Sequence, residues 1–263
     1  MGKGFNGIFH SFPGFFWESV VKNYEKAVWE PREGKSYFSF RLNGLLLVRI
    51  PGSAEEYGMS NETKTEINQK YWNSLAVMYD NILAFLRIFQ KKVVTLINPW
   101  ENIAFLDIGC GPGWAIRYAS GFVKEGKFYG IDLSPKMIEI AKKKAAGLKN
   151  VQYFNANAED LPFESDCFDV AICTNSFHHH PHPEVTMKEA YRVLKTKGRF
   201  YIVDPTTDGK LMKLLDVVSR KIEKSHIKMY STSEYETLFK QSGFKYIMSK
   251  KMFSSIKVHV GEK

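Results

Sequence analysis

The stretch FLDIGCGPG, residues 105–113, joins an apolar run to three glycines that stand at every second position. The apolar run predicts a buried strand that ends near Asp107, and a helical pattern opens at Trp114 directly after the last glycine. Glycines at 109, 111 and 113 allow a tight turn and let a ligand approach the backbone, because no side chain intervenes. A strand, a glycine turn and a helix in this order predict a loop that holds a nucleotide-like cofactor.

The spacing of the glycines selects among such cofactors. Dinucleotide-binding loops read GxGxxG or GxGxxA, in which the last small residue lets the helix pack on the strand. Here the pattern is GxGxG, and the bulky Trp114 follows it. The loop therefore argues against NAD and FAD.

Outward from this loop the chain alternates strand-like and helix-like segments. Strands are predicted at 103–108, 127–131, 151–154, 168–173 and 198–204, and helices at 61–82, 83–97, 114–122, 135–146, 182–194, 208–224 and 233–242. Two β-prone runs within 244–260 predict a closing hairpin. This order predicts an α/β fold, a Rossmann-like doubly wound sheet that is mostly parallel with an antiparallel C-terminal hairpin strand.

The first 58 residues differ from the rest in composition and in hydrophobic pattern. They hold 8 of the 19 glycines, and residues 1–16 show no sustained helical or alternating period. Two apolar runs around Asn43-Gly44 predict a hairpin over 36–50. We expect residues 1–58 to be an N-terminal extension, either a small β element or a translated leader with the functional protein starting at Met59, and residues 59–263 to form the main domain.

Composition excludes several classes of protein. The 263 residues are 44% hydrophobic and 25% charged, which is typical of a globular protein, and no apolar run approaches the roughly 18 residues of a membrane span. Three cysteines without a CxxC pair favour a reducing compartment, so we expect a cytoplasmic protein. The net charge of +9 permits attraction to nucleic acid without requiring it.

The glycine loop resembles the first motif of the class I S-adenosylmethionine-dependent methyltransferases, of the methyltransferase type 11-like group, and the resemblance covers about residues 71–260. Residues 129–138, YGIDLSPKMI, are similar to the family's second motif, in which an acidic residue binds the ribose hydroxyls. The resemblance implies this role for Asp132, since a carboxylate can accept both hydroxyl protons, and implies that Leu133 and Met137 contact the adenine faces. Asp132 could instead cap the following helix, but Ser134 is better placed to do so.

Residues 155–163, NANAEDLPF, are similar to the third motif, in which an Asp accepts a hydrogen bond from the adenine amino group. This chain has Asn157 there, whose side-chain carbonyl can accept the same bond without charge assistance. The next backbone amide, of Ala158, is expected to reach the ring. The resemblance implies S-adenosyl-L-methionine as cofactor, with further contacts from Tyr79, Asp107, Gly109, Cys110, Gly111, Gly113 and Asn175.

A histidine-rich segment, TNSFHHHPHP at 174–183, follows the predicted fourth strand. We expect no metal site, because neighbouring side chains of an extended segment point in opposite directions and no Cys or carboxylate stands at ligand spacing. The resemblance puts the segment beside the methyl group, where His178 or His179 would orient the acceptor or take its proton. In the alternative reading the histidines only line the pocket or face solvent.

These residues predict a methyltransferase that acts by in-line displacement on a small-molecule acceptor, with the methyltransferase domain over 59–263. Such chemistry needs alignment more than a nucleophile, which fits the lack of a catalytic triad or paired carboxylates. Enzymes that methylate base amino groups carry two prolines where this chain has TNSF, so nucleic acid is not the favoured acceptor. The alternatives are an RNA methyltransferase and a non-catalytic S-adenosylmethionine-binding protein.

Overall fold

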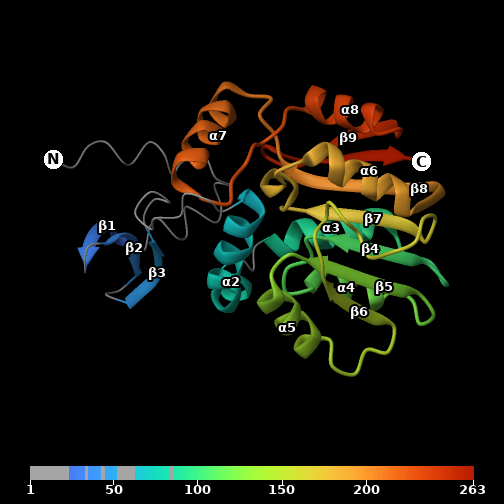
Figure 1. Cartoon of the computed structure of the whole chain (residues 1–263), viewed down its shortest axis with the longest axis horizontal. Coiled ribbons are helices and arrows are strands. Elements are labelled where there is room, and N and C mark those ends of the chain that lie inside the picture. Colours follow the sequence, from blue (N-terminus) through green and yellow to red (C-terminus); the bar gives the residue numbers. More distant parts are fainter. Residues whose placement is uncertain (1–23, 33–34, 43–44, 52–62, 83–85) are drawn as a thin grey trace. The chain divides into compact units, whose positions relative to one another are not determined.

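The computed structural model describes residues 24–32, 35–42, 45–51, 63–82 and 86–263 (Figure 1). The chain divides into two compact units, Met1–Glu62 and Thr63–Lys263, and each is described by itself.

In the smaller unit, three antiparallel strands pair in the order β1-β2-β3. They are β1 (Tyr24–Arg32), β2 (Lys35–Leu42) and β3 (Leu45–Pro51). The hairpin predicted over 36–50 corresponds to β2 and β3, whereas its Asn43-Gly44 turn lies outside the described residues. Strand β1 was not predicted, because four charges and a proline in its residues YEKAVWEPR weaken the strand signal of Tyr24, Val28 and Trp29.

A seven-stranded sheet with the order β6-β5-β4-β7-β8-β10-β9 forms the centre of the larger unit. Strands β4 to β8 run parallel, and β10 pairs antiparallel with both β8 and β9. This mixed sheet confirms the predicted fold class. The strands are β4 (Ala104–Ile108), β5 (Lys127–Asp132), β6 (Val151–Asn155), β7 (Phe168–Thr174), β8 (Leu194–Pro205), β9 (Lys245–Phe253) and β10 (Ile256–Glu262).

Helices cover both faces of this sheet, because the central strands are apolar on both sides. Phe105 of β4 packs into one core and its neighbour Leu106 into the other, as the alternation of side chains along a strand requires. The first core contains residues of α3 (Arg87–Ile97), α4 (Trp114–Ser120) and α5 (Pro135–Lys144). The second contains residues of α6 (Pro183–Val193) and α8 (Thr232–Gln241).

Two further helices complete the larger unit. Helix α2 (Lys64–Ile82) contacts α5, and α7 (Lys210–Ile222) follows β8. No helix among the described residues is both long and apolar enough to span a bilayer.

The connection order creates a crevice. From β4 the chain moves to β5 and β6 on one side, and it then returns to place β7 on the other side of β4. Loops that leave the carboxyl ends of β4 and β7 therefore run in opposite directions, which is where open α/β sheets bind ligands. The glycine loop and Asn175 follow the carboxyl ends of β4 and β7, and Asp132 ends the neighbouring strand β5.

Candidate functional site

A cavity lies at the carboxyl ends of β4, β5 and β7, and nine of its lining residues are ones that the sequence assigned to the site. Those nine are Gly109, Gly111, Asp132, Leu133, Met137, Asn157, Ala158, Asn175 and His179. The other lining residues are Thr65, Asn68, Trp72, Ile131, Ala156, Glu159, Ser176, His180, Pro181 and Thr186. The structure therefore brings together segments that the sequence separates by up to about 120 positions.

The glycine loop turns sharply and is held against β5. The backbone N–H groups of Gly109 and Cys110 both donate to the carbonyl of Ile131, at 2.9 Å each. The φ angles of Gly109 and Gly111 are +73° and +51°, values that side chains disfavour. A Cβ on Gly109 would also lie 2.1 Å from the hydroxyl of Ser176, so this position requires glycine.

Asp132 joins the glycine loop to the next helix. One carboxylate oxygen accepts the N–H of Gly111 at 2.8 Å, and the other accepts the N–H of Ser134 at 2.9 Å. Burial raises the pKa of Asp132 to about 6, although both hydrogen bonds favour the charged form. The side chain of Ser134 accepts the N–H of Met137 and caps α5, so Asp132 is not the cap.

Two polar side chains near the loop lack internal partners. Asp107 is fully buried, and neither of its carboxylate oxygens has a hydrogen-bond partner among the described residues. Burial, and secondarily the charge of Asp132, raises the pKa of Asp107 to about 8. The amide nitrogen of Asn175, on the cavity wall, likewise has no partner there. Groups of this kind suit a ligand that brings both charge and hydrogen-bonding capacity.

Other residues assigned from the sequence stand behind the cavity wall. A Cβ on Gly113 would lie 2.4 Å from the Tyr153 hydroxyl, which donates to the Gly113 carbonyl at 2.9 Å, so this glycine lets the loop pack on the sheet. The thiol of Cys110 is buried in the core, and Asp107 is not among the lining residues. The side chain of Tyr79 lies outside the described part of the chain.

Helix α2, which the sequence assigned to the site through Tyr79, supplies a wall through three residues that were not predicted. Thr65, Asn68 and Trp72 line the cavity, and their spacing of three and four positions puts them on one helix face. The side-chain amide of Asn68 donates to the carbonyl of His179 at 2.6 Å. That helical spacing was the available signal in the sequence.

The histidine segment was expected to be extended, but part of it is helical. Phe177–His179 form a short 3-10 helix, η4, so the rings of His178 and His179 lie with centroids only 3.9 Å apart. His180 is buried against Thr186, and His182 is exposed and paired with Glu159. The expectation that neighbouring side chains point in opposite directions was therefore wrong for His178 and His179.

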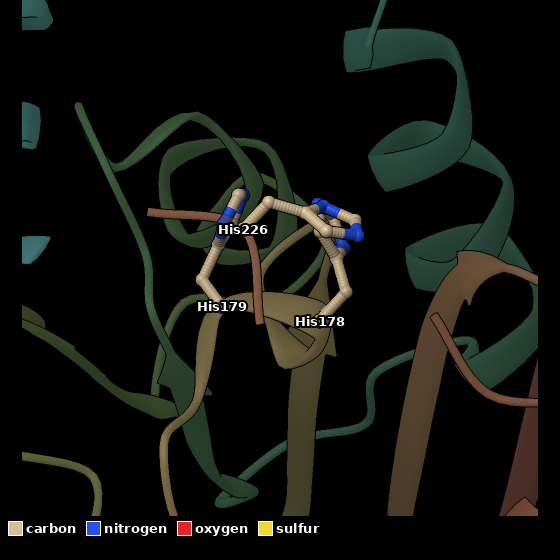
Figure 2. Close-up of side chains that lie close together, drawn as sticks. All are labelled: His178, His179 and His226. Carbon is tan, nitrogen blue, oxygen red and sulfur yellow. The ribbon is translucent and has the colours of Figure 1, made fainter. Parts of the chain in front are cut away.

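A third histidine joins this pair. Figure 2 shows His178 and His179 beside His226, which belongs to the segment after α7. Each of the three rings offers one nitrogen, and these nitrogens lie within 4.8 Å of one another. Nothing in the sequence around His226 signals this contact, because it is an isolated histidine 47 positions after His179.

The charges of the neighbouring groups differ between the two η4 histidines. Burial lowers the pKa of His178, but the carboxylate of Asp204, 2.9 Å from Nδ1, outweighs burial and leaves that pKa above its ordinary value. Burial and the adjacent His178 hold the pKa of His179 well below its ordinary value. His178 is thus the better proton acceptor of the two.

Comparisons with known proteins agree with this geometry. The family described as "Methyltransferase domain" matches residues 106–202. An uncharacterized methyltransferase of Bacillus subtilis is 34% identical over 145 residues, which are 54% of this chain and 56% of that protein. A demethylmenaquinone methyltransferase of Lactococcus lactis is 30% identical over 156 residues, or 55% of this chain and 62% of that protein. The chain thus matches about three fifths of the length of these curated relatives.

A solved structure shows the same similarity in three dimensions. The crystal structure of the YcgJ protein from Bacillus subtilis superimposes with a TM-score of 0.57 at 30% sequence identity, covering 62% of this chain and 70% of that one. The family match over residues 106–202 includes the three glycines of the loop and the strand that ends at Asp132. Sequence, strand order and the cavity at the switch point lead to one family, and the chain belongs to the class I S-adenosylmethionine-dependent methyltransferases.

Proposed function

We propose that this protein transfers a methyl group from S-adenosylmethionine to a small-molecule acceptor. The observation that carries the proposal is that Gly109, Gly111, Asp132 and His179 line one and the same cavity. Residues for the donor and residues able to act on an acceptor's proton therefore share one space.

The nucleoside part of the donor fits the first side of this cavity. Each oxygen of Asp132 already accepts one backbone N–H, and each has a further lone pair for a ribose hydroxyl. Leu133 and Met137 offer apolar contacts for the adenine faces. The side-chain carbonyl of Asn157 accepts the N–H of Glu159 at 3.1 Å, and its second lone pair can accept from the adenine amino group.

The amino-acid part fits the residues around the glycine loop. Gly109 and Gly111 leave the backbone open to a ligand, since neither has a Cβ on the cavity wall. A positive charge bound nearby would favour the ionised form of Asp107, whose carboxylate has no partner among the described residues and would stabilise that charge from behind the wall. When bound, the donor supplies the methyl group on a positively charged sulfur, so the protein's part is alignment and exclusion of water.

His178 and His179 are the residues that we propose to act on the acceptor. His179 lines the cavity, and its ring packs edge-on against Trp72 with a centroid distance of 4.9 Å. The Nδ1 of His178 is held by Asp204, which fixes the tautomer and leaves Nε2 to accept a proton. Trp72 favours an acceptor with a flat apolar part, and a relative named for demethylmenaquinone methylation is consistent with that class.

One experiment separates this proposal from its two alternatives. Labelled donor is incubated with the protein and, in separate reactions, a quinone and phenol panel, a cell metabolite extract and total RNA. We expect label in a small molecule and none in RNA. Label in RNA alone would favour the RNA alternative, and tight donor binding without transfer to any pool would favour a non-catalytic binding protein.

A further inference from the structure

We propose that His178, His179 and His226 form a binding site for a divalent transition-metal ion, with Glu223 as a fourth ligand. The proposal departs from the sequence-based expectation of no metal, which rested on an extended segment and could not include His226. It rests on the hydrogen bonds of the three rings, on an orphaned buried nitrogen and on the position of Glu223.

The hydrogen bonds determine which nitrogen of each ring carries the proton. His178 meets the carboxylate of Asp204 through Nδ1 at 2.9 Å, and His226 meets the carboxylate of Asp216 through Nε2 at 2.9 Å. His179 meets the backbone carbonyl of Ser225 through Nδ1 at 3.0 Å. Ionised carboxylates and carbonyls accept only, so each of these ring nitrogens is the donor.

The opposite nitrogens are left as lone pairs. They are Nε2 of His178, Nε2 of His179 and Nδ1 of His226. An imidazole that donates one N–H to a carboxylate or carbonyl and presents the other nitrogen outward is the usual arrangement of a metal-ligating histidine. All three rings have this arrangement, although they come from two segments far apart in the chain.

The nitrogen of His226 is the clearest sign of a missing partner. Its side chain is 1% exposed, and Nδ1 is buried with no hydrogen bond among the described residues. Buried ring nitrogens ordinarily find a partner, because leaving one unpaired is unfavourable. No described donor points at this one, whereas Glu223 has an oxygen 3.9 Å away.

Glu223 lies beside two of the three rings, and its Oε1 also accepts the hydroxyl of Ser225 at 3.1 Å, a bond that would break on metal binding. Its two carboxylate oxygens lie 3.9 Å from Nε2 of His179 and 3.9 Å from Nδ1 of His226, and its side chain is 30% exposed. These separations are too long for hydrogen bonds and suit groups that share an ion. Three neutral imidazoles and one carboxylate are ligands that Zn²⁺ accepts in tetrahedral geometry.

The spacing requires a small closure on binding. Ligand nitrogens about 2.0–2.1 Å from a tetrahedral Zn²⁺ lie roughly 3.3 Å from one another. The three rings offer nitrogens within 4.8 Å, so rotation of the side chains by about 1 Å brings them to that distance. Glu223 stands at the end of α7, where its side chain can reach inward.

Because His179 also lines the cavity, the ion would stand beside the space proposed for the acceptor. With the ion bound, Nε2 of His178 would be a ligand and would no longer take a proton. An oxygen or sulfur of the acceptor would then bind the ion in place of Glu223 or as a fifth ligand, which would lower the pKa of that group and release its proton to solvent. This second statement rests on the proposed function, whereas the metal site itself does not.

The test measures metal binding directly on the full chain without a histidine tag. Protein stripped with a chelator is titrated with Zn²⁺ in a calorimeter and with Co²⁺ in a spectrophotometer. We expect a single ion per chain and the strong visible absorption of four-coordinate cobalt. The variants His226→Gln and His179→Gln keep an amide that can donate to Asp216 or Ser225, and each should lose at least about tenfold in affinity.

A matched control lies in the same segment. His182 is exposed and paired with Glu159, outside the cluster, so His182→Gln should bind zinc as the parent does. Asp216→Asn leaves the three ligands in place and removes the charge that orients His226, together with the ion pair to Arg220, and it should weaken zinc binding by about tenfold. Circular dichroism verifies that each variant folds, and Asp216→Asn keeps the test usable should one histidine variant unfold.

Donor binding is measured on the same samples. Asp132→Ala should lose donor affinity and keep zinc, and His226→Gln should lose zinc and keep donor affinity. A parent chain that binds neither Zn²⁺ nor Co²⁺ overturns the metal site and leaves the methyltransferase proposal standing. Equal loss of zinc in His182→Gln and His226→Gln overturns it too, because binding would then be unspecific.

Discussion

Asp132 connects three parts of the site through one carboxylate. It accepts backbone N–H groups from the glycine loop and from the start of α5, and it lines the cavity. A residue with two acceptor oxygens and no donors suits a position at which the other groups, both backbone amides and the ribose hydroxyls we propose, are all donors.

We expect Asp132→Ala to weaken donor binding by about 1.5–3 kcal/mol, because a partly desolvated ribose would lose the acceptor for its hydroxyls. Calorimetric titration of the donor into parent and variant measures the difference. An affinity within twofold of the parent would remove Asp132 from the cofactor site.

The pKa of Asp132 also predicts how donor affinity depends on pH. With a pKa raised to about 6, the side chain becomes protonated below that pH and accepts hydrogen bonds less well. Donor affinity should therefore fall by up to about tenfold per pH unit below about 6 and stay level just above it. Asp132→Asn serves as the control, since its weaker affinity should lack this step.

At Asp107 we expect the stability of the fold and the affinity for the donor to require opposite things of one side chain. Its pKa is about 8 in the folded protein against 3.8 as the ordinary value, so the fold favours the protonated form and loses stability as pH rises from about 4 to 8. Asp107→Asn removes this loss. We expect it to raise the free energy of unfolding by about 1–3 kcal/mol near pH 8 and by little near pH 4. The same substitution should lower the affinity for the donor.

Urea unfolding of parent and variant at the two pH values measures the stability difference, and calorimetric titration measures the affinity for the donor. Equal stability differences at both pH values would contradict a buried ionising Asp107.

At the scale of elements, α2 is attached to the loop that begins α5. The side-chain amide of Gln69 donates to the carbonyl of Leu133 at 3.0 Å, and the hydroxyl of Ser134 donates to Asn73 at 2.6 Å. The helix therefore positions Trp72 and Asn68 over a cavity whose floor belongs to the sheet. Its cavity-lining role depends on a few polar contacts with another element.

We expect Gln69→Ala to reduce donor affinity about threefold to tenfold, because the bond to Leu133 is worth about 0.5–1.5 kcal/mol. Ser74→Ala is a suitable control, since its hydroxyl donates only to Tyr71 within the same helix. Donor titration of both variants and the parent measures the effect. A loss of the same size in Ser74→Ala would show that general helix stability, and not the contact with Leu133, is responsible.

At the scale of the whole molecule, the sheet, both cores and the cavity are contained in residues 63–263. We proposed from sequence that the methyltransferase domain begins at Met59. A shortened chain of residues 59–263 should therefore fold, bind the donor with parental affinity and melt within a few degrees of the full chain, since the core residues that the structure describes all belong to the larger unit.

Thermal unfolding and donor titration of the shortened chain test this. A chain that aggregates or loses donor binding would show that residues 1–58 belong to the functional fold. Full donor binding with lost methyl transfer would instead assign the first 58 residues to the acceptor.

The sequence by itself determined the features that arise within short stretches of chain. The glycine loop at 109–113, the strand that ends at Asp132 and the alternation of strands and helices were all legible, because turn chemistry and hydrophobic period act between neighbours. The larger sheet follows from that alternation, while β1 escaped notice because its own residues carry a weak strand signal.

Only the tertiary structure decided which distant residues meet. His226 and Asp216 stand beside the η4 histidines because the segment after α7 packs there, and no local pattern marks either residue. Packing likewise placed the backbone of Gly113 against Tyr153 and brought Trp72 to the cavity. The physical reason is that periodicity and turn preference are set by adjacent residues, whereas a site is built from contacts whose free energy exists only once the layers have packed.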